Sequence, residues 1–220
     1  MDQNFYLSQL YPFQDQVLRQ LSSVDTGFYL TGGTALSRGY LDHRFSDDLD
    51  FFVDDDPRFG LWAERFIRAI SQPGKWECQM LLREERFVRL NVVGQTISLK
   101  IEMINDVPSR IGEPWIHPLL GRIDTAENIL ANKVTAALDR AEPKDLADIW
   151  GLCHLKSLSL NEAITGAQGK AAGIFPADLA RVLCSVTHAD WEMVRWIHPP
   201  DPQAFIAQLN TLGKNLIITS

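Results

Sequence analysis

One segment constrains the fold more than any other part of the chain: residues 28–53, which read FYLTGGTALSRGYLDHRFSDDLDFFV. Its pattern predicts a short buried strand, a turn at Gly32 and Gly33, a brief helix and a second strand. On the second strand, Asp48 and Asp50 alternate with apolar residues. Because residues at i and i+2 of a strand point to the same side, the two aspartates are expected to share one face while the apolar residues turn toward the core.

The residue types of this segment suggest a chemistry. Two carboxylates on a rigid strand supply half of a divalent-metal site. The turn before them has two glycines, which let a ligand approach the backbone, and Thr34 at a helix N-terminus, where N–H groups favour a phosphate. An isolated Asp-x-Asp often arises by chance among 28 acidic residues. The combination predicts phosphoryl or nucleotidyl transfer, because Mg²⁺ binds carboxylate and triphosphate oxygens together.

The segment also resembles a known signature. Two runs carry the resemblance: Gly32-Gly33-Thr34-Ala35-Leu36 and Arg44-Phe45-Ser46-Asp47-Asp48-Leu49-Asp50-Phe51. They resemble the AbiEii/AbiGii toxin family of nucleotidyltransferase-like proteins. The core of that family is similar to the core of DNA polymerase β. The resemblance implies that the glycine turn, with Thr34, Arg44 and Ser46, binds a nucleoside triphosphate. It also implies that Asp48 and Asp50 hold Mg²⁺ or Mn²⁺.

A third carboxylate is expected from a neighbouring strand. Residues 76–104 change to a period of two and predict three strands, with Gly94-Gln95 as a hairpin turn between the last two. Lys100 and Glu102 fall on the side of the third strand opposite its core residues. In the resembled family a third carboxylate stands at this place, so Glu102 is expected to bind the metal or to accept the proton of the attacking hydroxyl. The alternative is an exposed glutamate paired with a lysine.

Helical patterns flank these strands. Residues 6–21 predict an amphipathic helix, and residues 62–70 predict another that stops by Pro73-Gly74. The acidic run 54–56 before Pro57 is interpreted as a solvated loop and helix cap. Residues 108–122 hold several prolines and glycines and predict a connector, beyond which the pattern is helical. Asp124 and Glu127 have the spacing of a capping box that opens the first of these helices, with Asp124 as its N-cap.

A second block of charged residues lies on these later helices: Lys133, Arg140, Lys144, Asp145 and Asp148. Taken alone, it is interpreted as a solvated helical face with ion pairs between neighbouring turns. The block is also similar to the family's second motif, a lysine, an arginine and a basic residue followed by aspartate. That resemblance implies that Lys133 neutralises triphosphate charge and that Asp145 or Asp148 orients Lys133 or the acceptor. Lys144 replaces the family's usual arginine, which puts its phosphate recognition in doubt.

Composition narrows the function classes. The net charge of −7 argues against a general nucleic-acid coat, although it leaves room for a local basic groove. Three distant cysteines suggest neither a disulfide framework nor a zinc motif. The first residues lack a basic leader, and no apolar run reaches the roughly 18 residues that span a bilayer. We therefore expect a cytoplasmic protein with no membrane association.

These observations together predict an α+β protein: a polymerase-β-like nucleotidyltransferase core, with a mixed sheet and flanking helices, followed by an α-helical domain. The expected boundaries are 1–107 for the core, 108–122 for the connector and 123–220 for the helical domain, with the active site in the cleft between the domains. The family implies the toxin of a bacterial toxin–antitoxin or phage-defence pair, with a cognate antitoxin, that transfers a nucleotide to a tRNA-like RNA. The alternatives are protein nucleotidylation by the same site and a non-catalytic nucleotide- or partner-binding module.

Overall fold

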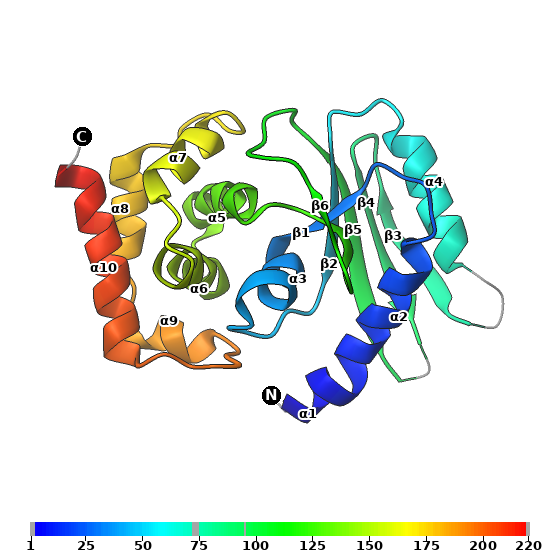
Figure 1. Ribbon diagram of the computed structural model, residues 1–220, viewed down its shortest axis with the longest axis horizontal. Helices are drawn as coiled ribbons and strands as arrows, with labels where there is room; N and C mark the ends of the chain where they lie inside the picture. Colours follow the sequence, from blue (N-terminus) through cyan, green and yellow to red (C-terminus); the bar gives the residue numbers. More distant parts are fainter. Residues whose placement is uncertain (1–2, 72–74, 95, 219–220) are drawn as a thin grey trace. The chain divides into compact units, whose positions relative to one another are not determined.

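A computed structural model describes residues 3–71, 75–94 and 96–218 of the protein (Figure 1). The chain forms two compact units, and each is assembled from more than one stretch of sequence. The first unit comprises the chain up to Gly39, Phe45–Pro108 and Pro114–Asp124. The second unit comprises Tyr40–Arg44, Ser109–Glu113 and the chain from Thr125 onward.

The first unit is a sheet with helices. The described residues form a seven-stranded sheet in the order β3-β4-β5-β2-β1-β7-β6, in which β2 pairs parallel with β5 and β1 parallel with β7, while the other pairs are antiparallel. The elements of this unit and the short helix η2 that leads out of it are α1 (Gln3–Phe5), η1 (Tyr6–Leu10), α2 (Tyr11–Leu21), β1 (Tyr29–Thr31), α3 (Gly32–Leu36), η2 (Ser37–Leu41), β2 (Leu49–Asp54), α4 (Phe59–Ile70), β3 (Glu77–Arg83), β4 (Phe87–Val93), β5 (Ser98–Asp106), β6 (Trp115–His117) and β7 (Gly121–Ile123).

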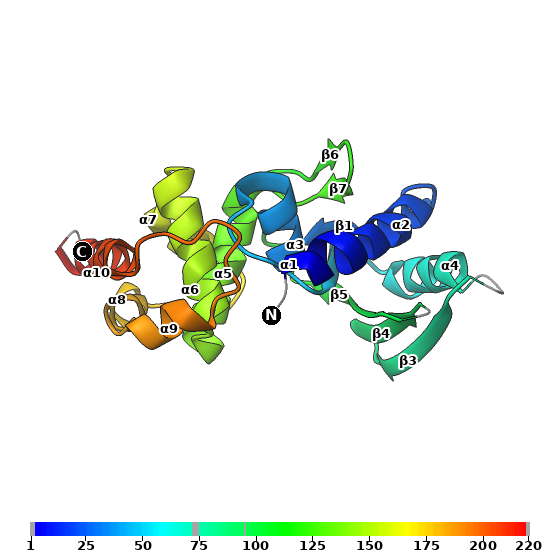
Figure 2. The same ribbon diagram turned by 90° about the horizontal axis from the view of Figure 1, so that it is seen from below.

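The core of this unit lies on one face of the sheet. Burial alternates along β2, β4 and β5, as expected for strands with one covered face. Helices α2 and α4 lie side by side on the covered face (Figures 1 and 2). The ring of Phe66 on α4 lies 4.8 Å from the ring of Phe51 on β2. The polar members of β2 and β5 therefore point to the opposite face.

The predicted strands and helices of this unit are confirmed, with three differences. Strand β2 begins at Leu49, so Asp48 lies just before the strand on which it was predicted. Helix α4 begins at Phe59, so Pro57 precedes its first turn. Residues 108–122 are not an irregular connector, because they contain β6 and most of β7, which extend the sheet beyond β1. The Gly94 amide donates to the Ile97 carbonyl and closes the turn between β4 and β5. Pro73, Gly74 and Gln95 lie outside the described residues.

The second unit is helical, which confirms the prediction for the region beyond the sheet. Helix α5 packs against α6, α7 and α8, and α10 packs against α8 and α9 (Figure 1). The helices are α5 (Ala126–Arg140), α6 (Pro143–Trp150), η3 (Gly151–Leu155), α7 (Leu160–Gln168), α8 (Pro176–Cys184), α9 (His188–Met193) and α10 (Pro202–Ile218). No helix among the described residues is both long and apolar enough to cross a membrane.

The cap of helix α5 differs from the prediction. Thr125 is the N-cap, and its hydroxyl accepts a hydrogen bond from the Asn128 amide at 3.2 Å. Asp124, the expected cap, is fully buried in the first unit and accepts a hydrogen bond from the Thr31 hydroxyl at 2.7 Å. A partner 93 residues away in sequence therefore determines the role of Asp124.

Candidate active site

The strand carboxylates share the face of the sheet opposite the core. Asp50 on β2 lies directly beside Glu102 on β5, its partner in the parallel pairing. Glu102 in turn pairs with Arg89 on β4. Asp48 lies one residue before β2 and two before Asp50. The register of β2 against β5 thus places Asp50 and Glu102 on one surface of the first unit, and Asp48 lies just before the start of β2.

The glycine turn packs against one of these carboxylates. Gly32 has a positive φ of 67°. A Cβ atom at this position would lie 2.4 Å from Oδ2 of Asp50, closer than Cβ atoms approach non-bonded atoms in proteins. Both the backbone conformation and the close approach therefore favour glycine. Gly33 follows at the start of α3 and is buried.

Thr34 and Ser46 lie inside the unit and support the segment that carries Asp48. The Thr34 hydroxyl donates to the carbonyl oxygen of Asp48 and lies 3.0 Å from the hydroxyl of Ser46. Both side chains are buried. From the other side, the amide of Gln14 donates to the carbonyl oxygens of Ser46 and Asp47. These contacts fix the backbone just before β2 and hence the starting point of the Asp48 side chain.

Two cations stand among the carboxylates. Nζ of Lys100 lies 2.8 Å from Oδ2 of Asp48 and 3.4 Å from Oε1 of Glu102. Nε of Arg89 donates to the same Glu102 oxygen at 2.7 Å. Burial alone would lower the pKa of Lys100, but the hydrogen bond and charge of Asp48, with the charges of Glu102 and Asp50, outweigh it and raise the pKa. The lysine is therefore a firmly protonated member of the cluster.

The donor set suits a hard divalent cation, because it consists of carboxylate oxygens. A cation already stands between two of them, in the form of the Lys100 ammonium group. As the side chains lie, no three His, Cys, Asp or Glu groups in the described part of the chain converge closely enough to hold a metal ion. Binding such an ion would require the carboxylates to turn away from Lys100 and toward one another.

The charged residues of the second block form a different cluster, inside the second unit. Nε and Nη2 of Arg44 donate to the two oxygens of Asp148 at 2.7 and 2.6 Å. Nζ of Lys133 lies 2.7 Å from Asp148 Oδ2, and Nε2 of His43 lies 2.9 Å from Oδ1. Burial would raise the pKa of Asp148, but the charges of Arg44 and Lys133 and the hydrogen bond from His43 hold it well below its usual range.

Asp145 extends this cluster by one turn of α6. It accepts hydrogen bonds from Lys133 Nζ at 2.8 Å and from Arg140 Nε at 2.9 Å. Asp145, Asp148 and Lys133 are all buried. The interpretation of this block as a solvated helical face is therefore wrong for these three residues, although it fits Lys144, which makes a surface pair with Glu142 at 2.8 Å.

Residues 40–44 enter the second unit to complete the cluster. An isolated β-bridge joins Arg44 to Trp196, and the amide of Ile197 donates to the carbonyl of His43 at 2.9 Å. Burial, the largest influence, lowers the pKa of His43. The neutral ring donates from Nε2 to Asp148, and Nδ1 has no hydrogen-bond partner among the described residues. Arg44, expected at the nucleotide, has its guanidinium oriented by Asp148.

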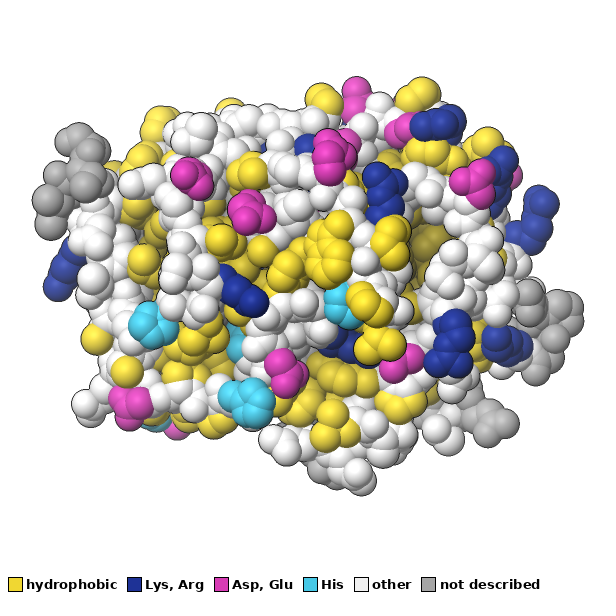
Figure 3. All heavy atoms as spheres, in the orientation of Figure 1, with side chains coloured by type: hydrophobic (Ala, Val, Ile, Leu, Met, Phe, Trp, Pro, Cys, Tyr) yellow, Lys and Arg dark blue, Asp and Glu magenta, His cyan; other side chains and the backbone are white. Residues whose placement is uncertain are grey.

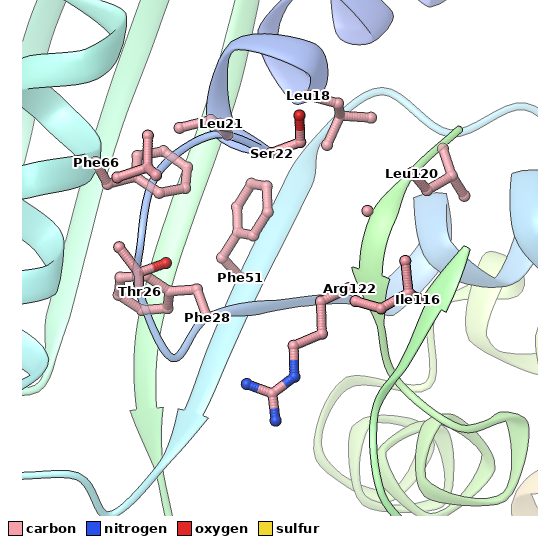
Figure 4. Close-up of a pocket in the computed structure, with 12 residues that line it drawn as sticks. Leu18, Leu21, Ser22, Thr26, Phe28, Phe51, Phe66, Ile116, Leu120 and Arg122 are labelled. Carbon is pink, nitrogen blue, oxygen red and sulfur yellow. The ribbon is translucent and has the colours of Figure 1, made fainter. Parts of the chain in front are cut away.

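An apolar pocket in the first unit is separate from the carboxylates. It has a volume of about 270 Å³, and Phe51 and Phe66 line it together with Arg122 at one side (Figure 4). Phe51 follows Asp50 on β2 and therefore points to the other face of the sheet. The pocket thus lies on the core side of β2, away from the candidate site.

Two residues near the predicted sites had no role assigned from the sequence: His43 and Arg89. A lysine was expected only as the alternative partner of Glu102, and Lys100 does lie 3.4 Å from it. The position of Lys100 could be predicted from the sequence, because it precedes Glu102 by two residues on a strand and therefore lies on the same face. Arg89 becomes a partner of Glu102 only through the register of β4 against β5. His43 reaches Asp148 across 105 residues of sequence, which no local pattern reveals.

Comparison with known proteins places this geometry in context. A family model described as "Nucleotidyl transferase AbiEii toxin, Type IV TA system" matches residues 16–172. Among solved structures, JHP933 from Helicobacter pylori superposes with a TM-score of 0.66 at 20% identity, covering 100% of this chain and 94% of that one. A putative nucleotidyltransferase from the same organism gives 0.66 at 19% identity, covering 100% and 96%.

A third structure is the nucleotidyltransferase toxin MenT4 from Mycobacterium tuberculosis H37Rv. It has a TM-score of 0.63 at 22% identity, and the match covers 94% of this chain and 82% of that one. At such identities the likeness shows a shared fold. No match is found among curated proteins.

Proposed function

Because the chain belongs to the AbiEii family of nucleotidyl transferase toxins of type IV toxin–antitoxin systems, we propose that it is a metal-dependent nucleotidyltransferase that transfers a nucleoside monophosphate from a triphosphate to an RNA. The observation that carries the proposal is the pairing of Asp50 with Glu102 across β2 and β5, with Asp48 beside them. These carboxylates share one face with the close-packed glycine turn at Gly32.

In this proposal the strand residues serve the reacting phosphate. Asp48, Asp50 and Glu102 would hold Mg²⁺ or Mn²⁺, which neutralises charge on the triphosphate and on the leaving pyrophosphate. Gly32 and Gly33 would let the triphosphate approach the backbone, while Thr34 and Ser46 fix the segment before Asp48. An acceptor hydroxyl oxygen would bond to the α-phosphorus as the bond to pyrophosphate breaks. Its proton would pass to Glu102 or to water.

The helical residues would act through charge. Lys133 would neutralise triphosphate charge, as the family resemblance implies, with Asp145 and Asp148 orienting its ammonium group. Asp148 pairs with both Arg44 and Lys133. A phosphate that bound Arg44 or Lys133 would therefore compete with the Asp148 carboxylate for that cation. Direct contact of a phosphate with Lys133 or Arg44 would require one of these ion pairs to be exchanged.

The acceptor has a second candidate. The net charge of −7 disfavours a broad contact with RNA and thereby favours a protein hydroxyl as the acceptor for the same site. On the face shown in Figure 3, lysine and arginine side chains are interspersed with acidic and apolar ones instead of forming one basic stripe. Family membership favours RNA, a cognate antitoxin and action in the cytoplasm, where nucleoside triphosphates and RNA are found.

The test is transfer of label from α-labelled ATP, GTP, CTP and UTP, each with Mg²⁺, to total RNA and to cell lysate protein. Asp48→Asn/Asp50→Asn should reduce transfer by about 10²-fold or more, because it removes two charges that act on the transition state. Asp55→Asn is the matched control, since Asp55 is half-exposed beyond β2, pairs with Arg86 and has a positive φ of 47° that asparagine tolerates.

The destination of the label identifies the acceptor. Label on RNA that the double variant loses supports the main proposal, and label on protein supports the second candidate. If neither receives label from the wild type, the catalytic proposal is wrong. Stabilisation by nucleotide without transfer would then identify a non-catalytic binding module.

A further inference from the structure

Lys100 lies among the three carboxylates that the proposed function assigns to a metal ion. It shares a strand face with Glu102, and its Nζ bridges Asp48 Oδ2 at 2.8 Å and Glu102 Oε1 at 3.4 Å. These are two of the oxygens that a divalent ion would need. The lysine and the ion therefore compete for the same donors.

The local charges favour such competition. The carboxylates of Asp48, Asp50 and Glu102 carry three negative charges, while Lys100 and Arg89 bring two positive ones, which leaves a net charge of −1. Arg89 contacts Glu102 from β4, away from Asp48, so it stabilises Glu102 without bridging the pair. Departure of Lys100 would change the net charge from −1 to −2 and so strengthen the attraction of the carboxylates for a metal ion.

The exposure and flexibility of Lys100 also allow its ammonium group to change partners. Its side chain is 38% exposed and Asp48 is 35% exposed, so both can be rehydrated when the pair separates. A lysine ammonium group is a compact charge on a flexible stem that can change partners at little cost. A triphosphate arriving with the metal ion would offer it phosphate oxygens in place of the carboxylates.

We propose that Lys100 is an internal counter-ion that occupies the carboxylates until a divalent ion and a triphosphate arrive together, when its ammonium group transfers from Asp48 and Glu102 to a phosphate oxygen. This inference rests on the proposed function and deepens it. It makes metal and nucleotide binding mutually dependent: the metal displaces the lysine, and the nucleotide receives it. A metal ion alone would bind weakly.

The test measures Mn²⁺ binding by electron paramagnetic resonance of the free ion, with and without a non-hydrolysable ATP analogue. For the wild type, the analogue should tighten Mn²⁺ binding about tenfold or more. In Lys100→Met, Mn²⁺ alone should bind about tenfold more tightly than in the wild type, and the effect of the analogue should shrink. Lys75→Met removes a lysine from the same unit whose ammonium group contacts Gln20 and the ring of Trp76, and it should behave as the wild type.

Lys100→Gln is measured in parallel, so that a variant without the charge remains if the methionine substitution prevents folding. If Lys100→Met or Lys100→Gln binds Mn²⁺ no more tightly than the wild type, the inference is wrong, even where Asp48→Asn/Asp50→Asn abolishes binding. If that double variant binds Mn²⁺ as the wild type does, the metal ligands of the proposed function are wrong as well. The two failures are therefore distinguishable.

Discussion

Asp48 in the first unit and Asp148 in the second each pair with a lysine, at 2.8 and 2.7 Å, yet the two pairs differ in exposure. The Asp48 and Lys100 side chains are 35% and 38% exposed, whereas those of Asp148 and Lys133 are 0% and 8% exposed. An exposed pair exchanges readily with water and ions, while separating a buried pair leaves charges without solvent. The two pairs thus have similar distances but different roles. We expect the sheet cluster to exchange its cation and the helical cluster to hold its cations in place.

The largest expected effect is on the buried cluster. Asp148→Asn removes the charge that holds Arg44, Lys133 and His43, and we expect it to lower the free energy of unfolding by about 3–5 kcal/mol, because buried cations lose their counter-ion. Urea unfolding measures this loss. Asp139→Asn, at an exposed position on α5, is the control and should change stability little. A loss below about 1 kcal/mol for Asp148→Asn would show that the cluster is not structurally essential.

The pH dependence of stability should report the same cluster. Native His43, surrounded by Asp148, Arg44 and Lys133, has a pKa lowered from 6.5 by burial, so the unfolded chain binds a proton that the native protein rejects. Stability should therefore decline as the pH falls below 6.5, with a slope of up to about 1.4 kcal/mol per pH unit.

A second loss should follow in acid. The pKa of Asp148 is depressed from 3.8, so its stabilising contribution is present above this pH and is lost as the pH falls through the depressed value. Unfolding in urea between pH 8 and pH 2 tests the first step and the onset of the second. His43→Gln should flatten the first one, and His188→Gln, at an exposed position, should leave it unchanged. If the stability of His43→Gln still declines below pH 6.5 with the same slope, another titrating group is responsible for the decline.

The glycine turn offers a smaller effect that joins structure to function. Gly32→Ala places a Cβ atom 2.4 Å from Oδ2 of Asp50 at a positive φ, and it should cost about 1–2 kcal/mol in unfolding free energy. It should also displace Asp50, and nucleotidyl transfer should therefore fall even under conditions where the variant remains folded. Gly60→Ala on α4, where a Cβ atom meets nothing within 4 Å, is the control. Unchanged transfer in Gly32→Ala would separate the turn from the site.

The smallest expected stability change is at the exposed pair. Asp48→Asn should alter the free energy of unfolding by less than about 1 kcal/mol, since the carboxylate is partly hydrated and exchanges partners with water. Urea unfolding of this variant beside Asp148→Asn measures the contrast directly. Equal losses in the two variants would contradict the distinction between the clusters.

The sequence predicted much of the sheet because its signals are local. Alternation along β2, β4 and β5 indicated which side chains face the core, and hence that Asp50 and Glu102 share the opposite face. Strands β6 and β7 were missed because each has three residues in a stretch rich in proline and glycine. Their place at the sheet edge depends on pairing with β1, which no short pattern encodes.

The sites divide in the same way. Spacing predicted that Asp48 and Asp50 share a face and that Lys100 and Glu102 share the face opposite the core, whereas the expectation that Glu102 joins the aspartates came from the family resemblance. Burial of Asp148 could not be predicted, because it depends on Arg44 and His43, more than 100 residues earlier, entering the second unit. Helical periodicity alone predicted a solvated face for this block, since charged side chains are seldom buried without partners that only the fold supplies.

The most direct test of the claim that the sheet carboxylates are the exchangeable cation site is urea unfolding of the wild type and of Asp48→Asn/Asp50→Asn at increasing Mn²⁺, in the presence of a non-hydrolysable ATP analogue. We predict that the wild-type midpoint rises with Mn²⁺, because an ion bound only by the native state stabilises it, and that the double variant does not respond. An equal rise in both proteins, or no rise in the wild type, would contradict the account.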